Sequence, residues 1–145
     1  MTTSSVCKKV IDRMVAALVN ATGAGDRVFD SREAAIARDE MPCIAITPPD
    51  SEDTQAFAQD VDQNTALVTM EVIVRDDDWR PLADDIAVAA HRVLSCDSEL
   101  QALVVSLRKD GRKWAGAEAD QTAGIDSITY RVTYLSLSND LTSTI

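Results

Sequence analysis

The sequence predicts an α+β fold, with two main helices packed on one face of a mainly antiparallel or mixed sheet of about four to five strands. Two kinds of spacing predict this class. Residues 4–20 and the segment after Asp78 repeat apolar residues every three or four positions, whereas residues 65–75 and 125–137 alternate apolar and polar residues. No linker separates these segments, so residues 1–145 are expected to form a single domain.

Composition narrows the classes of function. Of the 145 residues, 46% are hydrophobic but only 4% are aromatic, so the core must be built mainly from Val, Ile, Leu and Ala. The net charge of −10 disfavours generic binding to nucleic acid or to a membrane, because phosphate surfaces repel carboxylates. An acidic surface does suit a channel that DNA must traverse without sticking. No apolar run approaches the roughly 20 residues of a membrane span.

The first third of the chain contains one predicted helix and two predicted strands. Thr and Ser residues cap the helix at 4–20, and the glycines that follow favour its end. Residues 27–29 and 41–47 are β-prone, and the second of these strands ends at Pro48-Pro49. Residues 32–38, between the two strands, are compatible with a helical turn.

The middle third combines an acidic loop, a strand and a helix. Residues 50–63 are polar and follow neither period, so we expect a long mobile loop. Residues 65–75 form the most strongly alternating strand. Asp76, Asp77 and Asp78 then offer carboxylates to the start of a helix that ends near Ser95.

The last third is predicted to contain a hairpin and a final strand. Asp110-Gly111, a dipeptide favoured in tight hairpin turns, separates two β-prone segments, residues 103–108 and 112–117. The tip of this hairpin would be basic, with Arg108, Lys109, Arg112 and Lys113. The final strand spans residues 125–137, and residues 138–145 are expected to be a flexible tail.

No set of residues is equipped for catalysis or for binding a cofactor. The only histidine, His91, lies within a predicted helix, where a packing or surface role is favoured over catalysis. Cys7, Cys43 and Cys96 lie far apart and are expected to be reduced, buried thiols rather than metal ligands. Residues 60–71 partly match a calcium-binding loop, but Thr65 stands where the turn needs glycine. We therefore expect no enzyme, no metal and no cofactor.

Surface contacts are the remaining way for this chain to act. Trp and Arg are the commonest anchors of protein interfaces, so Trp79 and Arg80 are candidates, although Trp79 could equally pack at the start of its helix. The basic hairpin tip is the second candidate, against the alternative that its cations only keep a sheet edge soluble. The candidate contact residues are Trp79, Arg80, Arg108, Lys109, Arg112 and Lys113, together with the acidic loop at 50–63.

In the order, length and residue pattern of its segments, the chain resembles the tail-terminator proteins of long-tailed phages, of the minor tail protein U type. The resemblance spans nearly the whole chain and rests on "RVFDSREAAIARDEMPCIAITPP", "ALVTMEVIVRD", "PLADDIAVAAHRVL" and "SITYRVTYLSLS" rather than on a short motif. It implies a homohexameric ring that ends a tail tube and offers a surface for joining the head. The implied partners are the major tail tube protein and a head-completion or connector protein, in a virion tail assembled in the bacterial cytoplasm.

Two other classes of function are compatible with the residues. A cytosolic adaptor would bind one basic protein through the many carboxylates and would not self-assemble. A carboxylate-based enzyme would need two acidic side chains converging in one pocket.

Overall fold

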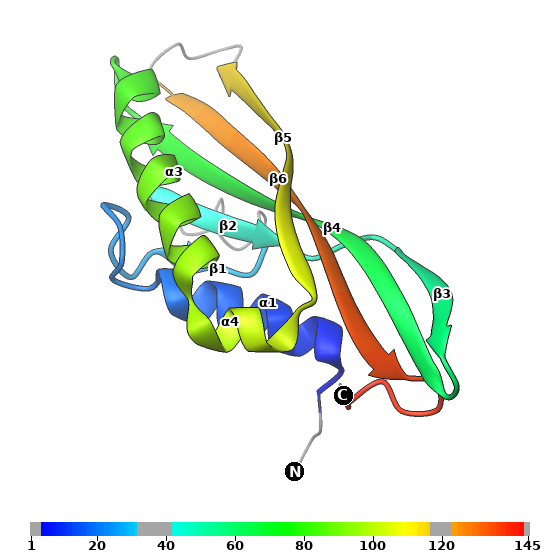
Figure 1. The fold of residues 1–145 in the computed structure, drawn as a ribbon. Helices are drawn as coiled ribbons and strands as arrows, with labels where there is room; N and C mark the ends of the chain where they lie inside the picture. Colours follow the sequence, from blue (N-terminus) through cyan, green and yellow to red (C-terminus); the bar gives the residue numbers. More distant parts are fainter. Residues whose placement is uncertain (1–3, 32–41, 117–122, 144–145) are drawn as a thin grey trace.

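The computed structural model describes residues 4–31, 42–116 and 123–143, and these residues form three helices packed against one mixed sheet (Figure 1). The predicted α+β class is confirmed, with one strand more than the upper expected number. The elements are α1 (Val6–Leu18), β1 (Val28–Phe29), β2 (Cys43–Thr47), β3 (Glu52–Ala58), β4 (Val61–Arg75), α3 (Trp79–Cys96), α4 (Ser98–Leu103), β5 (Ser106–Gly116) and β6 (Ala123–Leu137). The helical turn predicted at 32–38 lies outside the described residues.

A long antiparallel pair, β4 and β6, is the backbone of the sheet. The two strands pair from Val61 opposite Leu137 to Arg75 opposite Ala123. The strand order is β1-β2-β4-β6-β5, and β1 pairs with β2 in parallel. β3 pairs with the first part of β4, beyond the end of β2, so this end of the sheet projects away from α3 (Figure 1). The molecule is therefore elongated along β4 and β6.

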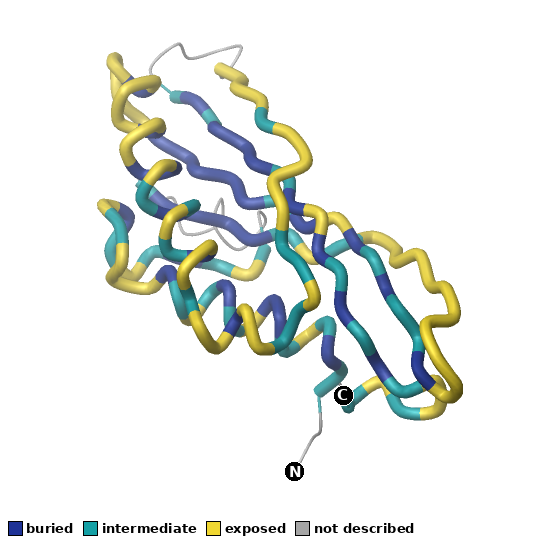
Figure 2. Tube along the Cα trace, in the orientation of Figure 1, coloured by how far each residue is buried: buried dark blue, intermediate teal, exposed yellow. Residues whose placement is uncertain are grey.

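The main core lies between the helices and one face of the sheet. The alternation predicted for β4 and β6 is confirmed, because Val68, Met70, Tyr130 and Val132 are each no more than 1% exposed. Figure 2 shows that burial concentrates under α1 and α3 and falls off along the projecting end. A smaller cluster with Cys43, Ala45 and Ile73 lies on the other face of the sheet.

The helix ends follow the chemistry of their caps. Ser5 caps α1 by accepting a hydrogen bond from Lys8 N at 3.1 Å. Asp78 stands at the N-cap of α3 but makes no side-chain cap bond. Its own N–H donates to Asp76 Oδ1 at 2.8 Å, so among the three carboxylates predicted at this helix start Asp76 orders the preceding turn, and the residue at the N-cap makes no cap bond. None of the described helices is both long and apolar enough to cross a bilayer.

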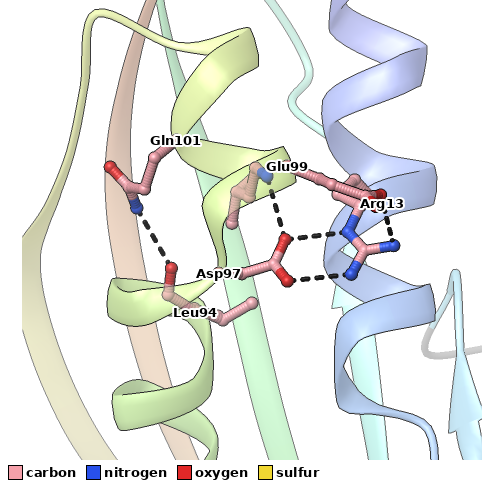
Figure 3. A network of polar contacts seen from close by, with 6 residues as sticks. Arg13, Leu94, Asp97, Glu99 and Gln101 are labelled. Atoms are coloured by element: carbon pink, nitrogen blue, oxygen red, sulfur yellow. Dashed lines mark hydrogen bonds and ion pairs between the residues drawn. The ribbon is translucent and has the colours of Figure 1, made fainter.

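Asp97 joins α1 to α4, a short helix that the sequence pattern did not reveal. Its carboxylate accepts two hydrogen bonds from the Arg13 guanidinium at 2.8 Å each and one from Leu100 N at 2.9 Å (Figure 3). Gln101 closes the turn before α4 by donating to Leu94 O at 3.1 Å (Figure 3). The Arg13 hydrogen bonds hold the pKa of Asp97 below its ordinary value.

Asp97→Ala is expected to lower the free energy of unfolding at neutral pH by about 1 kcal/mol, the usual cost of a lost N-cap. Because the folded pKa of Asp97 is lowered, its contribution is present above the ordinary carboxyl pKa and is lost as pH falls below about 4. Urea titrations from neutral to acid pH should therefore show the deficit shrinking. Asp12→Ala, in an exposed pair with Lys8, is the control and should cost only a few tenths of a kcal/mol. A deficit that stays constant with pH would contradict this account.

The predicted hairpin around Asp110-Gly111 is wrong. Residues 106–116 form one continuous strand, β5, which pairs along β6. The pairing shifts register between Lys109 and Gly111, so Asp110 is the extra residue of a β-bulge rather than part of a turn. Asp110 accepts hydrogen bonds from Arg131 at 3.1 and 3.2 Å. β5 pairs with β6 on both sides of the bulge, and Asp110-Gly111 therefore lies within an edge strand rather than in a turn.

The predicted mobile loop at 50–63 is also wrong. Most of it forms β3, a two-residue turn and the start of β4. All residues of β3 are exposed, so no alternation of apolar residues marks it as a strand. Pairing with β4 holds it, together with side-chain bonds from Thr54 to Asn64 and from Tyr134 to Glu52.

The C-terminal segment, expected to be a flexible tail over 138–145, is hydrogen-bonded as far as it is described. Val6 N donates to Leu141 O at 2.8 Å, and Leu137 N donates to Ser143 O at 3.1 Å. Ser138 N donates to Asp60 O at 2.9 Å. Residues 138–143 thus connect the start of α1 with the projecting end of the sheet.

Candidate interaction surfaces

The basic residues of β5 are divided between the two faces of the sheet. In the pairing with β6, Lys109 stands opposite Tyr130 and Arg112 opposite Ile128, on the face that carries the helices. Arg108 and Lys113 alternate with them and lie on the other face. The four cations predicted to share one tip therefore form two pairs on an edge strand, and only one pair faces α3.

Arg112 is engaged in ion pairs within the fold rather than free at the surface. Its guanidinium donates to both carboxylate oxygens of Asp126, at 2.9 and 2.6 Å, and to Asp84 of α3 at 2.8 Å. Asp126 is fully buried, and these hydrogen bonds raise the pKa of Arg112, with the Asp126 bonds as the largest cause. Arg112 also lies over the ring of Trp114, 4.7 Å from its centroid. It is thus a link between α3, β5 and β6.

Trp79 is a core residue rather than an exposed anchor. It is only 8% exposed, and its ring lies directly against the backbone of Gly124 in β6. The exposed Arg80 covers the same ring, with its guanidinium carbon 4.9 Å from the centroid. Of the two roles considered for Trp79, packing at the start of the helix is therefore the one that the structure has.

A groove of about 200 Å³ runs between α3 and β5. Ala87, Val88 and Ile128 supply its apolar lining, and Val88 is 47% exposed there. His91, Arg92 and Lys109 supply polar and basic groups beside this lining.

His91 has a packing role in this groove. Its Nδ1 lies 2.8 Å from the Tyr130 hydroxyl, and the two rings stack with centroids 5.7 Å apart. Tyr130 is fully buried, and this burial raises its pKa. The histidine therefore satisfies a buried hydroxyl, which is the packing role that the sequence favoured.

The β3–β4 hairpin, residues 52–66, is the part of these strands that projects from the sheet beyond β2 and away from α3 (Figure 1). Its projecting part carries several carboxylates: Asp50 just before it, and then Glu52, Asp53, Asp60 and Asp62. The sequence has no Lys or Arg from residue 42 to residue 74. This end of the molecule is therefore strongly acidic.

Phe57 is the exposed aromatic residue of this hairpin. Its side chain is 58% exposed, and it lies at the register shift between Ala56 and Ala58. A β-bulge redirects a side chain away from the regular alternation of a strand. The sequence indicated residues 50–63 as a candidate contact region but did not single out Phe57, because the segment looked like a loop; a single aromatic residue within an acidic stretch was a usable signal.

A second hollow, of about 500 Å³, lies on the sheet face opposite the described helices. Its lining is polar, with Thr65, Thr69, Thr129 and Arg131 across β4 and β6, and with Leu67 among them. Thr65 faces Thr133 at 3.5 Å and Thr69 faces Thr129 at 3.4 Å between hydroxyl oxygens. These rows of hydroxyls give the hollow a polar floor.

Within residues 4–31, 42–116 and 123–143, no three His, Cys, Asp or Glu side chains gather in a way that could hold a metal ion. The three cysteines are free, as expected, but Cys96 is exposed and only Cys43 is fully buried, so the expectation of three buried thiols is wrong. Burial and the nearby Glu52 raise the pKa of Cys7, which disfavours a reactive thiolate.

Comparison with known proteins relates this chain to a virion component through its fold. No family model matches the sequence, and no curated protein sequence matches it. A chain from a solved structure described as the virion of a native gene transfer agent particle is similar, with a TM-score of 0.56 and 16% identity. The match covers 87% of this chain and 92% of that chain, so nearly the whole fold is shared.

Proposed function

We propose that this chain is a non-enzymatic structural subunit of a phage, prophage or related particle, and that it caps a completed tail tube as a homohexameric ring. The fold that it shares with a gene transfer agent virion chain over almost its whole length carries the proposal. The finer role, a tail terminator, rests on the resemblance of its segments to that family. The ring would belong to the tail of the particle and would form in the bacterial cytoplasm.

Charge and shape support a subunit that works through its surfaces. The net charge of −10 suits a ring whose lumen passes DNA without binding it. The elongated sheet presents two separate contact regions, the acidic hairpin at one end and the groove between α3 and β5 nearer the middle, in register with Val68 and Met70 of β4. A subunit with two different contact patches is suited to cyclic assembly.

The mechanism would be steric. One face of the ring complements the last ring of tube protein, and the other face presents no equivalent surface, so that no further tube subunit adds. That second face is then free to bind the head-completion or connector protein. Nothing in this mechanism needs a cofactor or a bond-breaking step.

Tube assembly in the presence of this chain tests the proposal. The major tail tube protein encoded in the same genome should form long tubes alone, and should form shorter tubes with a cap of density at one end when this chain is added. Negative-stain images measure tube length, and native mass spectrometry should find a six-subunit assembly of this chain. Unchanged tube lengths together with a chain that stays monomeric with and without tube protein would contradict the proposal. A salt-sensitive complex with one basic protein, without self-assembly, would favour an adaptor instead.

A further inference from the structure

The geometry points to a head-to-tail contact between two copies of this chain, in which the β3–β4 hairpin of one copy inserts Phe57 into the α3–β5 groove of the next. The inference rests on the proposed ring, because it names the contact that would join neighbouring subunits. It depends on three properties of the described residues: an exposed aromatic residue, a groove that has room for it, and opposite charges around the two.

Phe57 has the properties of an interface anchor. With 58% of the side chain exposed, it belongs to neither apolar cluster of the described chain. Aromatic residues are enriched at the centres of protein interfaces, where a few of them carry most of the binding energy. The bulge lies between Ala56 and Ala58, so Phe57 does not follow the alternation of side chains along β3. An aromatic residue held out in this way is suited to a pocket on another molecule.

The α3–β5 groove has the size and lining that a phenyl ring requires. Its volume is about 200 Å³, whereas a cavity of about 150 Å³ is large enough for benzene. Val88 is 47% exposed in the groove and lies beside Ala87 and Ile128, which are buried. Covering Val88 and Phe57 together would remove two large apolar side chains from water at one contact.

The charges around the two features are complementary. The hairpin brings Glu52, Asp53 and Asp60 within a segment that has no basic residue. The groove brings Arg92 of α3 and Lys109 of β5 beside its apolar lining. Opposite potentials steer two surfaces together and set their register. They also disfavour the contact of one hairpin with another hairpin, so the pairing of unlike surfaces is selected.

The arrangement in the subunit makes this contact intermolecular. The hairpin projects from one end of the sheet, with Phe57 beside Val61 and Asp62 of β4 (Figure 1). The groove residues Lys109 and Ile128 lie in register with Val68 and Met70, several residues farther along β4, so Phe57 lies away from the groove of its own copy. Each copy therefore offers one hairpin and one groove, and the contact joins unlike patches. Such a contact gives a closed ring when its rotation closes and an open chain when it does not.

Self-association is expected to weaken as salt rises, because screening reduces the attraction between the acidic hairpin and the basic groove. Raising the salt from about 0.05 M to about 0.5 M should raise the dissociation constant of self-association on the order of tenfold. Sedimentation velocity at a series of concentrations measures it. The Lys109→Glu variant should associate more weakly at low salt and should lose most of this dependence. An association that strengthens with salt would show that apolar contact alone drives it.

Single substitutions on each side test the contact. Phe57→Ala and Val88→Glu should each weaken self-association on the order of 30-fold or more, as hot-spot residues do. Val105→Glu is the matched control, because Val105 is 59% exposed but lies outside both the hairpin and the groove. Its association should equal that of the unmodified chain. Melting temperatures within about 2 °C of the unmodified chain would show that all three variants fold. Normal assembly of Phe57→Ala or Val88→Glu, or equal loss in the control, would overturn the inference.

Mixing the two defective variants tests the direction of the contact. A Val88→Glu copy keeps its hairpin and a Phe57→Ala copy keeps its groove, so one intact contact remains between them. An equimolar mixture should form one-to-one dimers that grow no further, while each variant alone stays monomeric. A mixture that stays monomeric at concentrations where the unmodified chain assembles would overturn the inference.

Tube assembly with the same variants separates this inference from the proposed function. If the unmodified chain caps tubes as a ring and both variants do so equally well, the contact is wrong and the proposed function stands. If the variants lose self-association as expected but the unmodified chain never limits tube length, the contact is right and the capping role is wrong. If the unmodified chain is monomeric both alone and with tube protein, both are overturned.

Discussion

Gly124→Ala is expected to destabilise the protein by about 3 kcal/mol, the range in which an overpacked core or a displaced aromatic residue falls. A Cβ atom built on Gly124 would lie 2.1 to 2.3 Å from three atoms of the Trp79 ring, far inside any contact that real side chains make. The ring would have to leave its place between α3 and β6. Thermal unfolding should show a fall in melting temperature on the order of 10 °C.

Gly116→Ala is the matched control for this prediction. Gly116 pairs with Gly124 across β5 and β6, but a Cβ atom there would meet Trp79 only at 3.9 Å, which is ordinary contact. It should change the stability by less than about 1 kcal/mol. In a Trp79→Leu background, Gly124→Ala should cost much less than in the unmodified chain, because the clashing ring is gone. Equal costs in the two backgrounds would show that the Trp79 contact is not the cause.

Arg112→Met is expected to lower the free energy of unfolding by about 3 to 5 kcal/mol, because it leaves the buried Asp126 carboxylate without its counter-charge. Arg112 donates two hydrogen bonds to Asp126, whose side chain has no exposed surface. Desolvating a carboxylate costs far more than an exposed ion pair gains. Denaturant titration should show a lower midpoint with an unchanged slope.

The double replacement Arg112→Met with Asp126→Leu tests the reason for this loss. Removing both charges leaves no buried ion, so the double variant should be more stable than Arg112→Met alone. Lys8→Met, which breaks an exposed pair with Asp12 at 2.8 Å, should cost only a few tenths of a kcal/mol and serves as the control. A double variant as unstable as the single one would show that lost packing, rather than the unpaired charge, dominates.

The parts of the fold that bury apolar residues were the parts that the sequence predicted. β4 and β6 alternate because one face covers the core, and α1 repeats apolar residues because one side of it packs on the sheet. β3 buries nothing, so its pairing left no pattern in the sequence. α4 is only six residues long, too short for a helical period to stand out.

The contact surfaces were harder to predict for a different physical reason. Asp110-Gly111 is compatible with a turn and with a bulge, and only the presence of β6 as a partner for both halves decides between them. Trp79 could be exposed or buried until Gly124, far along the chain, supplied a flat surface for its ring. The basic character of β5 was visible in the sequence, whereas its division between two faces follows from the register with β6.

The central position of β6 in the sheet has a consequence for biosynthesis. β6 is the last of the described strands in chain order, yet it pairs with β4 on one side and β5 on the other. While the ribosome is still making the C-terminal third, β4 has no partner along most of the edge that β6 will occupy. An alternating strand with an open edge is prone to pair with other chains. Release of a complete β6 therefore ends the period in which a nascent subunit is most exposed to aggregation.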